Sequence, residues 1–303
     1  MIYSIGEMLI DLMQEGDAYV PYIGGAPANV ACHIRRSNTP ALFVGKISED
    51  AFGSSMHQFL IDNDIYFPLT KSPHKTALAL VSHTEGDRSF QFYRDRSSDL
   101  FLSIEDIDRI PFKPRDILHF CSLGLVPYET TLSAHLHAIN KCKALGGIIS
   151  FDVNLREKLW ENVDLAYETV MKCIPLCDII KVNEEELKWL CGTQDIKAGL
   201  KQLQTHQQLV ICTMGKDGSI TLTQDGTYIH TDSLNVPQVD TTGAGDSFIA
   251  MVLASLSNSH ESFERWQHST LPFALDYARQ ISARVVSQHG AIPDIDYEVK
   301  NFD

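Results

Sequence analysis

Long apolar runs, an excess of positive charge and closely paired cysteines are all missing from this chain of 303 residues. No apolar run is long enough to span a bilayer, so a protein built on transmembrane helices is not expected. Lysine and arginine number 25 against 39 aspartates and glutamates, which gives a formal charge of −14. A duplex nucleic-acid binder needs a cationic face to neutralise phosphates, so that class is not expected either. A nucleotide ligand stays open, because local backbone amides bind an anion whatever the net charge is.

The cysteines are odd in number, seven in all, and scattered along the chain without a C-x-x-C pair. This usage predicts free, buried thiols in a reducing compartment. The first residues, MIYSIGEMLIDL, lack the positive segment and the small-residue cleavage site of a signal peptide. We therefore expect a cytoplasmic protein with no nucleic-acid or membrane partner.

Two familiar nucleotide-binding motifs are absent as well. The chain has no Walker A sequence, so it is not a P-loop protein. No strand followed by G-x-G-x-x-G and a helix occurs near the N-terminus, which argues against an oxidoreductase with a dinucleotide cofactor.

What the chain does contain is a regular alternation of short β-branched runs and helix-length segments. Runs typical of strands buried on both faces are IYSIG, ALFVG, DILHFCS, GIISFDV, DIIKVN and LVICTMG. Segments with apolar residues at helical spacing occupy residues 50–64, 131–146, 163–174 and 196–206. Such alternation predicts an α/β fold with a mostly parallel sheet and right-handed crossovers.

Two stretches interrupt this rhythm, from about residue 11 to 24 and from about residue 71 to 102. The second contains TALALVSHTEGDRSFQFYRD, which predicts a hairpin with Thr84 to Asp87 at its turn. We expect a small antiparallel sheet that stands off the main body and acts as a lid. No linker, repeat or low-complexity tract appears, so residues 1–303 are expected to form a single domain with this lid.

The densest group of small and polar residues is VDTTGAGDSF, residues 239–248, which leads into the apolar run IAMVLASL. An extended entry, a glycine-rich turn and a helix over about 244–257 match the layout of ligand sites in open α/β sheets. The first-turn amides of a helix are unpaired, and Gly243 and Gly245 let them converge into an anion hole. Asp246 would lie beside that hole, where it suits proton acceptance from an alcohol during phosphoryl transfer. By spacing alone, helix capping explains the same residues equally well.

Five motifs in order along the chain resemble the signatures of the ribokinase-like (PfkB) family of carbohydrate and nucleoside kinases. They are GGAPANVA (24–31), FDVNLR (151–156), KVNEEE (181–186), TMGKDGS (213–219) and DTTGAGDSF (240–248). Together they cover essentially the whole chain. The resemblance implies a three-layer α/β/α sandwich with a mostly parallel central sheet and a small antiparallel lid, and it implies ATP-dependent phosphorylation of a sugar.

The resemblance also assigns residues to the chemistry. In the family, the aspartate of GAGD is the catalytic base, which matches Asp246, and the preceding amides match Gly243, Ala244 and Gly245. Arg156 resembles a family position whose guanidinium approaches the transferred phosphate. A surface salt bridge is the alternative for that arginine.

Sugar hydroxyls are held in the family by residues that match Asp11, Gly24, Gly25 and Asn29. A polyol needs acceptors and amide groups that face a cleft, and carboxylate and carboxamide side chains supply both. An exposed loop carboxylate for Asp11, or an ordinary residue at a helix start for Asn29, would be the structural alternative.

The nucleotide is expected at TMGKDGS, where Thr213, Gly215 and Gly218 let the backbone approach ATP. KVNEEE resembles the N-x-x-E motif, so that Asn183 also belongs to the ATP site, and Asn183 with Glu186 is expected to organise Mg²⁺ through water. A solvated acidic helix start is the alternative for this motif.

Many members of the family also bind a monovalent cation such as K⁺ beside the anion hole. Asp240 and Thr242 match part of that site, and carbonyl groups from about residue 285 to 290 would complete it. Lid sheets in the family often pair between subunits, which implies a homodimer through the lid.

The lid segment FQFYRDRSSDLFL, together with GEMLID, is similar to the corresponding segments of fructokinases. Tyr93 and Arg94 are expected near the sugar, although strand alternation lets only one of them point straight in. The expected reaction is phosphorylation of the 6-hydroxyl of D-fructose by ATP. A 2-keto-3-deoxygluconate kinase, a ribokinase and a riboside or nucleoside kinase remain alternatives. A sugar-responsive regulator without turnover is disfavoured, because a protein that only binds sugar needs no base at Asp246.

Overall fold

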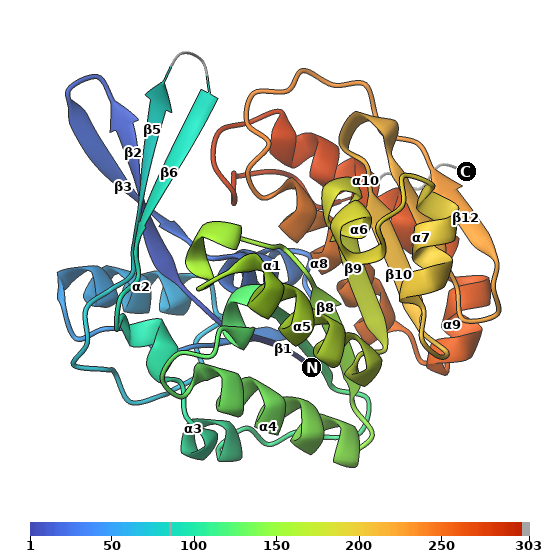
Figure 1. The fold of residues 1–303 in the computed structure, drawn as a ribbon, viewed down its shortest axis with the longest axis horizontal. Coiled ribbons are helices and arrows are strands. Elements are labelled where there is room, and N and C mark those ends of the chain that lie inside the picture. Colours follow the sequence, from blue (N-terminus) through green and yellow to red (C-terminus); the bar gives the residue numbers. More distant parts are fainter. Residues whose placement is uncertain (85–86, 299–303) are drawn as a thin grey trace.

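The computed structural model describes residues 1–84 and 87–298. For residues 82–84 and 87–90 it describes the backbone alone. Its body is an eight-stranded sheet in the order β12-β11-β10-β9-β8-β7-β1-β4 (Figure 1). The strands from β10 to β4 run parallel, and β11 and β12 add an antiparallel edge. The strands are β1 (Ile2–Ile5), β4 (Ala41–Val44), β7 (Ile117–Cys121), β8 (Ile148–Asp152), β9 (Ile179–Asn183), β10 (Leu209–Thr213), β11 (Ser219–Leu222) and β12 (Tyr228–Thr231).

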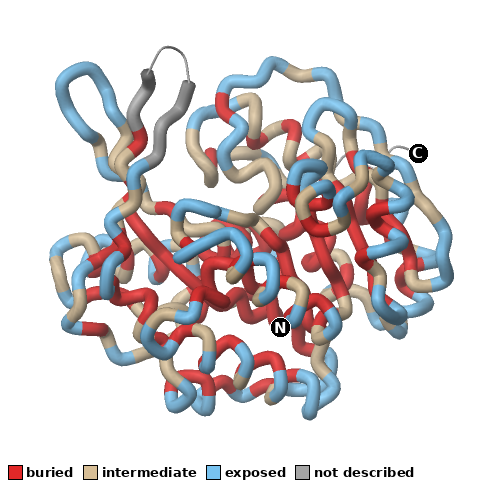
Figure 2. Tube along the Cα trace, in the orientation of Figure 1, coloured by how far each residue is buried: buried red, intermediate tan, exposed pale blue. Residues whose placement is uncertain are grey.

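Helices pack on both faces of this sheet, because side chains alternate in direction along each strand. In β9, Ile179 joins the core under α1, α8, α9 and α10, whereas Ile180 and Val182 join the core under α3 to α7. Figure 2 shows the strands of the sheet as the buried centre of the molecule. The helices are α1 (Ala26–Arg36), α2 (Ala51–Asp62), α3 (Ile104–Asp108), α4 (Thr131–Ala144), α5 (Val163–Cys173), α6 (Glu184–Cys191), α7 (Ile196–Leu203), α8 (Ala244–Asn258), α9 (Phe263–Ser269) and α10 (Leu271–Val286).

The predicted α/β fold with a mostly parallel sheet is confirmed. All six predicted strands are present and parallel, and the predicted helices correspond to α2, α4, α5, α7 and α8. The antiparallel edge made by β11 and β12 was not predicted from the sequence. The described part of the chain contains no helix whose length and apolar character would let it cross a bilayer.

A second, four-stranded sheet stands off one side of the body (Figure 1). Its order is β3-β2-β5-β6, with β2 (Leu9–Glu15), β3 (Ala18–Gly24), β5 (Leu78–Thr84) and β6 (Asp87–Tyr93). The β2–β3 and β5–β6 pairs are antiparallel, whereas the central strands β2 and β5 run parallel. Of the predicted turn, residues 85 and 86 lie outside the described residues. The sheet ends at Tyr93, and a short 3₁₀ helix follows at Ser98–Phe101.

Candidate active site

The first turn of α8 is shaped by a glycine that no other residue can replace without strain. Gly243 caps the helix with a left-handed backbone, φ 78°, and a side chain on it would run into the carbonyl oxygen of Ala291. The first bond of the helix runs from the Ser247 N–H to the Gly243 carbonyl at 2.8 Å. The amides of Gly245 and Asp246 precede that bond, so they have no partner one turn back in the helix. They form the positive, anion-binding end of α8.

The Ala244 amide differs from the predicted arrangement. It donates to the Thr241 carbonyl at 3.3 Å, and this bond closes the turn that leads into α8. The structure therefore leaves the open amides at the second and third positions of the helix.

Asp246 is the one acidic residue in the first turn of α8, and it is poised between charged and neutral forms. Burial raises the pKa of its carboxyl to about 6, and the charge of Asp152 adds to the rise. The opposite effects come from Asn29, whose Nδ2 donates to Asp246 Oδ2 at 2.8 Å, and from Lys181 and Arg156. A carboxylate with this pKa is deprotonated at neutral pH yet basic enough to accept a proton.

Arg156 connects the acids of the site electrostatically. Its side chain is exposed, and its Nη1 donates to the Leu155 carbonyl at 3.1 Å. The same guanidinium lowers the pKa of Glu7, of Asp11 and of Asp246. The structure thus brings Arg156 within electrostatic reach of Glu7 and Asp11 near the N-terminus and of Asp246 near the other end of the chain.

Asp11 lies on β2, where its carboxylate packs against the backbone of β3. A side chain on Gly24 would collide with Asp11 Oδ2. Burial raises the pKa of Asp11 to about 6, against the lowering effect of Arg156. Gly25 then caps α1 with φ 118°, and a Cβ there would come within 2.5 Å of the Glu7 carbonyl oxygen. These glycines hold β2, β3 and the start of α1 close together.

The two neighbours at the end of β6 point in different directions. The β2–β5–β6 register places Tyr93 on the face opposite to Asp11, where 53% of its surface is exposed. Arg94 is buried, with Nε donating to Asp99 at 2.7 Å and Nη2 to the Leu123 carbonyl at 3.1 Å. Its Nη1 has no hydrogen-bond partner among the described residues. The structure therefore does not bring Tyr93 to the predicted site, and it leaves Arg94 with one unused donor.

Glu7 belongs to the same region and was missed from the sequence. It is 3% exposed, its Oε2 has no partner among the described residues, and burial raises its pKa to about 7 against the effect of Arg94. The residue follows the carboxyl end of β1, and that position in a parallel sheet is the sequence signal that could have identified it.

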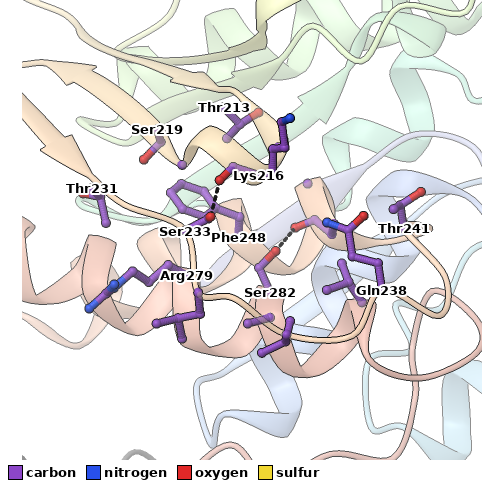
Figure 3. Close-up of a pocket in the computed structure, with 18 of the residues that line it drawn as sticks. Thr213, Lys216, Ser219, Thr231, Ser233, Gln238, Thr241, Phe248, Arg279 and Ser282 are labelled. Carbon is purple, nitrogen blue, oxygen red and sulfur yellow. Dashed lines mark hydrogen bonds between the residues drawn. The ribbon is translucent and has the colours of Figure 1, made fainter.

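A cavity of about 480 Å³ opens beside the first turn of α8 (Figure 3). Thr213, Gly215 and Gly218, the residues predicted to contact ATP, line it, and Ala244 and Gly245 close it at the helix end. Asn183 is not among the lining residues, although it is the register partner of Thr213 in the neighbouring strand. Because Ala244 and Gly245 belong to its lining, the cavity reaches the first turn of α8.

Two further walls of this cavity were missed from the sequence. One is the extended chain between β12 and α8, and the other is α10, where Arg279, Ala283 and Val286 recur at helical spacing. Figure 3 shows Ser282 of α10 beside the start of α8, where its hydroxyl donates to the Ala244 carbonyl at 3.1 Å. The remaining lining residues are Lys216, Ser219, Thr231, Ser233, Leu234, Asn235, Val236, Gln238, Thr241 and Phe248.

The N-x-x-E residues form a capping box at the start of α6. The Glu186 amide donates to Asn183 Oδ1 at 2.8 Å, and the Asn183 amide donates to Glu186 Oε2 at 2.9 Å. Glu186 Oε1 accepts from the Leu155 amide at 2.8 Å. Both carboxylate oxygens are therefore held by backbone donors, so this donor set suits a hydrated Mg²⁺ bound through water better than direct coordination. Among the described residues, no group of three or more histidine, cysteine or acidic side chains gathers as a metal site.

Asp240 joins the loop before α8 to the loop after α10. Its Oδ1 accepts from the amide and the hydroxyl of Thr242 at 2.9 and 2.7 Å, and its Oδ2 accepts from the Gly290 amide at 3.1 Å. The predicted cation residues and the predicted carbonyl segment are thus adjacent. This arrangement fits a cation that is held mainly by backbone carbonyl groups.

Comparison with known proteins agrees with this geometry. Fructokinase-1 from Oryza sativa subsp. japonica is 34% identical over 313 residues, covering 99% of this chain and 96% of the relative. A fructokinase double mutant from Vibrio cholerae, crystallised with fructose, ADP and potassium, has a TM-score of 0.84 at 33% identity. The match covers 96% of this chain and 93% of that one.

An aminoimidazole riboside kinase from Salmonella enterica has a TM-score of 0.85 at 29% identity, covering 96% of this chain and 95% of its own. The family model described as "pfkB family carbohydrate kinase" matches residues 1–297. With its parallel sheet, its second sheet and an aspartate at the head of α8, the chain belongs to the pfkB family of carbohydrate kinases.

Proposed function

We propose that this carbohydrate kinase transfers the γ-phosphoryl group of ATP to the 6-hydroxyl of D-fructose. The observation that carries the proposal is the position of Asp246, at the anion-binding end of α8 and at the edge of the nucleotide cavity. Fructokinases with near-complete coverage of the chain support fructose as the acceptor.

In the proposed reaction, Asp246 accepts the proton of the sugar hydroxyl while the hydroxyl oxygen attacks the γ-phosphorus. The bond to the bridging oxygen of ATP breaks, so ADP and the sugar phosphate leave. The amides of Gly245 and Asp246 stabilise the charge on the moving phosphoryl group. Arg156 is proposed to approach the same group, since an arginine fork suits phosphate oxygens.

The sugar is proposed to lie between α1 and the second sheet. Asp11 and Asn29 supply an acceptor and a carboxamide, and the close backbone of Gly24 and Gly25 leaves room beside them. Arg94 is proposed to contribute its unused Nη1 donor. We propose that β2, β3, β5 and β6 act as a lid that closes over the sugar and excludes water from ATP.

The nucleotide is proposed to occupy the cavity beside Thr213, Gly215 and Gly218. Asn183 and Glu186 would hold the waters of a Mg²⁺ ion, which would neutralise charge on the phosphates of ATP. Asp240 and Thr242 would lie beside a K⁺ ion, and a fructokinase crystallised with potassium supports that ion.

We further propose that the chain forms a homodimer through the second sheet and works in the cytoplasm. Strands β3 and β6 are the edges of that sheet, and the side chains of Tyr19, Tyr22 and Tyr93 are 43%, 46% and 53% exposed. Exposed aromatic groups on a sheet that projects from the body favour association. All seven cysteines are free, in keeping with a reducing compartment.

A riboside kinase is the second candidate, because the aminoimidazole riboside kinase from Salmonella enterica matches as well in structure as the fructokinases do. A coupled ADP-release assay over fructose, ribose, 2-keto-3-deoxygluconate and aminoimidazole riboside separates the two candidates. The highest kcat/KM is expected with fructose. A higher value with any other acceptor would replace fructose in the proposal.

Asp246→Asn tests the base. The variant keeps the size of the side chain but removes the proton acceptor, so kcat with fructose should fall by about 10³-fold or more. Fructose binding, measured by calorimetry, should persist. The matched control is Asp164→Asn, because Asp164 lies in the first turn of another helix, α5, and is exposed. Near-normal turnover by Asp246→Asn would show that another group takes the proton.

A further inference from the structure

A buried ion pair joins the carboxyl ends of β8 and β9. Asp152 and Lys181 are register partners in these parallel strands, and Lys181 Nζ lies 2.7 Å from Asp152 Oδ2. The residues are 1% and 5% exposed. Their side chains lie on the face of the sheet that packs against α8, since Phe151 and Ile180 beside them join the opposite core.

The ammonium group of this pair lies against the first turn of α8. A Cβ built on Gly245 would be 3.1 Å from Lys181 Nζ. A side chain at this position would press on the ammonium group and make it shift by a few tenths of an ångström, so the glycine lets the lysine approach the helix start closely. The positive charge therefore lies close to Gly245, which also lines the cavity.

The charge on Lys181 is held in place by its surroundings. Burial opposes the charged form, but attraction from Asp152, Glu186 and Asp246 together raises the pKa of the lysine. Asp152 Oδ1 has no hydrogen-bond partner among the described residues. A buried ion pair with an unused oxygen is weak evidence for a purely stabilising role, because desolvation offsets much of the attraction.

We propose that Lys181, held by Asp152, is a positioning residue that supplies a fixed positive charge to the phosphoryl-transfer centre through the first turn of α8. The inference rests on the proposed kinase function and adds a residue to it. The amides of Gly245 and Asp246 face the phosphoryl group from the cavity side, and the ammonium reinforces them from the protein side. Because the ammonium group is buried, its charge acts more strongly than it would at the surface.

The test compares two variants that differ only at the lysine. Asp152→Asn keeps the lysine charge and an oxygen that accepts from it, so any loss of kcat with fructose in this variant measures the contribution of the Asp152 charge alone. The double variant K181M/D152N removes both charges of the pair, and the nearby Glu186 keeps the backbone donors of both its carboxylate oxygens, so the variant should fold. Its kcat should be about 100-fold below that of Asp152→Asn, with KM for fructose changed by less than about threefold.

Thermal unfolding of each variant reports folding separately from activity. Lys46→Met is the matched control, because Lys46 forms an ion pair of the same 2.7 Å length with Asp106 outside the site. We expect this control to keep the wild-type kcat.

Two outcomes would overturn the inference. If K181M/D152N is as active as Asp152→Asn, the lysine only neutralises Asp152. If Asp152→Asn is itself as inactive as the double variant, the effect does not belong to the lysine charge. A wild-type chain without kinase activity would instead overturn the proposed function, and this inference with it.

Discussion

At the residue scale, Asp246 meets two opposing requirements. As the proposed base it must carry a charge to accept a proton, yet burial raises the pKa of its carboxyl to about 6. The Asn29 donor at 2.8 Å partly restores the charged form. We expect kcat/KM to fall as the pH drops below about 6, since protonation removes the base.

The same balance makes the Asn29→Ala variant informative. Loss of the donor disfavours the charged carboxylate, so the acidic limb of the pH profile should move to higher pH. The measurement is kcat/KM for fructose from pH 4.5 to 8 in both proteins. An acidic limb at the same pH in both would mean that another group controls it.

Gly243 and Gly192 form a matched pair for the turn before α8. Both have left-handed backbones, with φ 78° and 67°, but only Gly243 has a neighbour, the Ala291 carbonyl, in the way of a side chain. Gly192→Ala should lower the free energy of unfolding by about 1 kcal/mol, the cost of the backbone alone. Gly243→Ala should lower it further and should also reduce kcat, because the helix start must shift. Equal losses in denaturant unfolding, with kcat kept, would count against this view of the turn.

At the scale of elements, the strands of the main sheet could be predicted from the sequence, but the walls of the cavity could not. Buried parallel strands leave continuous apolar runs, which is why β1, β4 and β7 to β10 were predicted. The chain between β12 and α8 lines the cavity proposed for the nucleotide without regular structure, so it has no periodicity to read. The motif of Asn183 and Glu186 could be recognised in the sequence. The same spacing is also typical of a helix capping box, which the structure contains at these residues.

The direction in which side chains of the second sheet point could not be predicted from the sequence either. Strand alternation limits Tyr93 and Arg94 to opposite faces, but only the register of β6 on β5 decides which of them lies inward. Glu7 was missed for a related reason. Nothing in the local sequence GEMLID distinguishes this glutamate from an exposed one. Its burial becomes evident only when β1 is placed in the sheet.

Helix α1 connects the part of the site proposed for the sugar to the chain after α10. Asn29 contacts Asp246, and one turn later His33 lies 2.9 Å from the Ala291 carbonyl through Nε2 and 2.6 Å from the Tyr297 hydroxyl through Nδ1. Burial lowers the pKa of His33 to about 4. The imidazole is therefore neutral, with Nε2–H donating to the carbonyl and Nδ1 accepting from the tyrosine.

His33→Ala should detach the segment after α10 from α1. The variant removes a buried imidazole together with both of its hydrogen bonds, so the free energy of unfolding should fall by about 2–4 kcal/mol. Amide hydrogen exchange should increase over residues 287–297. His137→Ala is the control, because His137 pairs with Asp108 at the surface, and its effect should stay within about 0.5 kcal/mol. Unchanged exchange over 287–297 would exclude the proposed connection.

At the scale of the whole molecule, the site is assembled from two parts that meet at α8. The second sheet and α1 supply the residues proposed for the sugar, and β10, the chain after β12 and α10 line the cavity proposed for the nucleotide. The first turn of α8 touches both, through the Asp246–Asn29 bond on one side and Ala244 and Gly245 on the other. Two ligands should therefore stabilise the fold through separate contacts.

Ligand-induced thermal shifts can test this separation. A ligand at 100 times its Kd stabilises the folded state by about 2.7 kcal/mol, so fructose and a non-hydrolysable ATP analogue should each raise Tm of the wild type. Asp11→Asn should lose the shift caused by fructose and keep the one caused by the ATP analogue. Ala283→Leu, which adds bulk to the α10 wall of the cavity, should lose the nucleotide shift and keep the fructose shift. If each variant lost both shifts, the two parts would not bind independently, and binding of one ligand would have to build the site for the other.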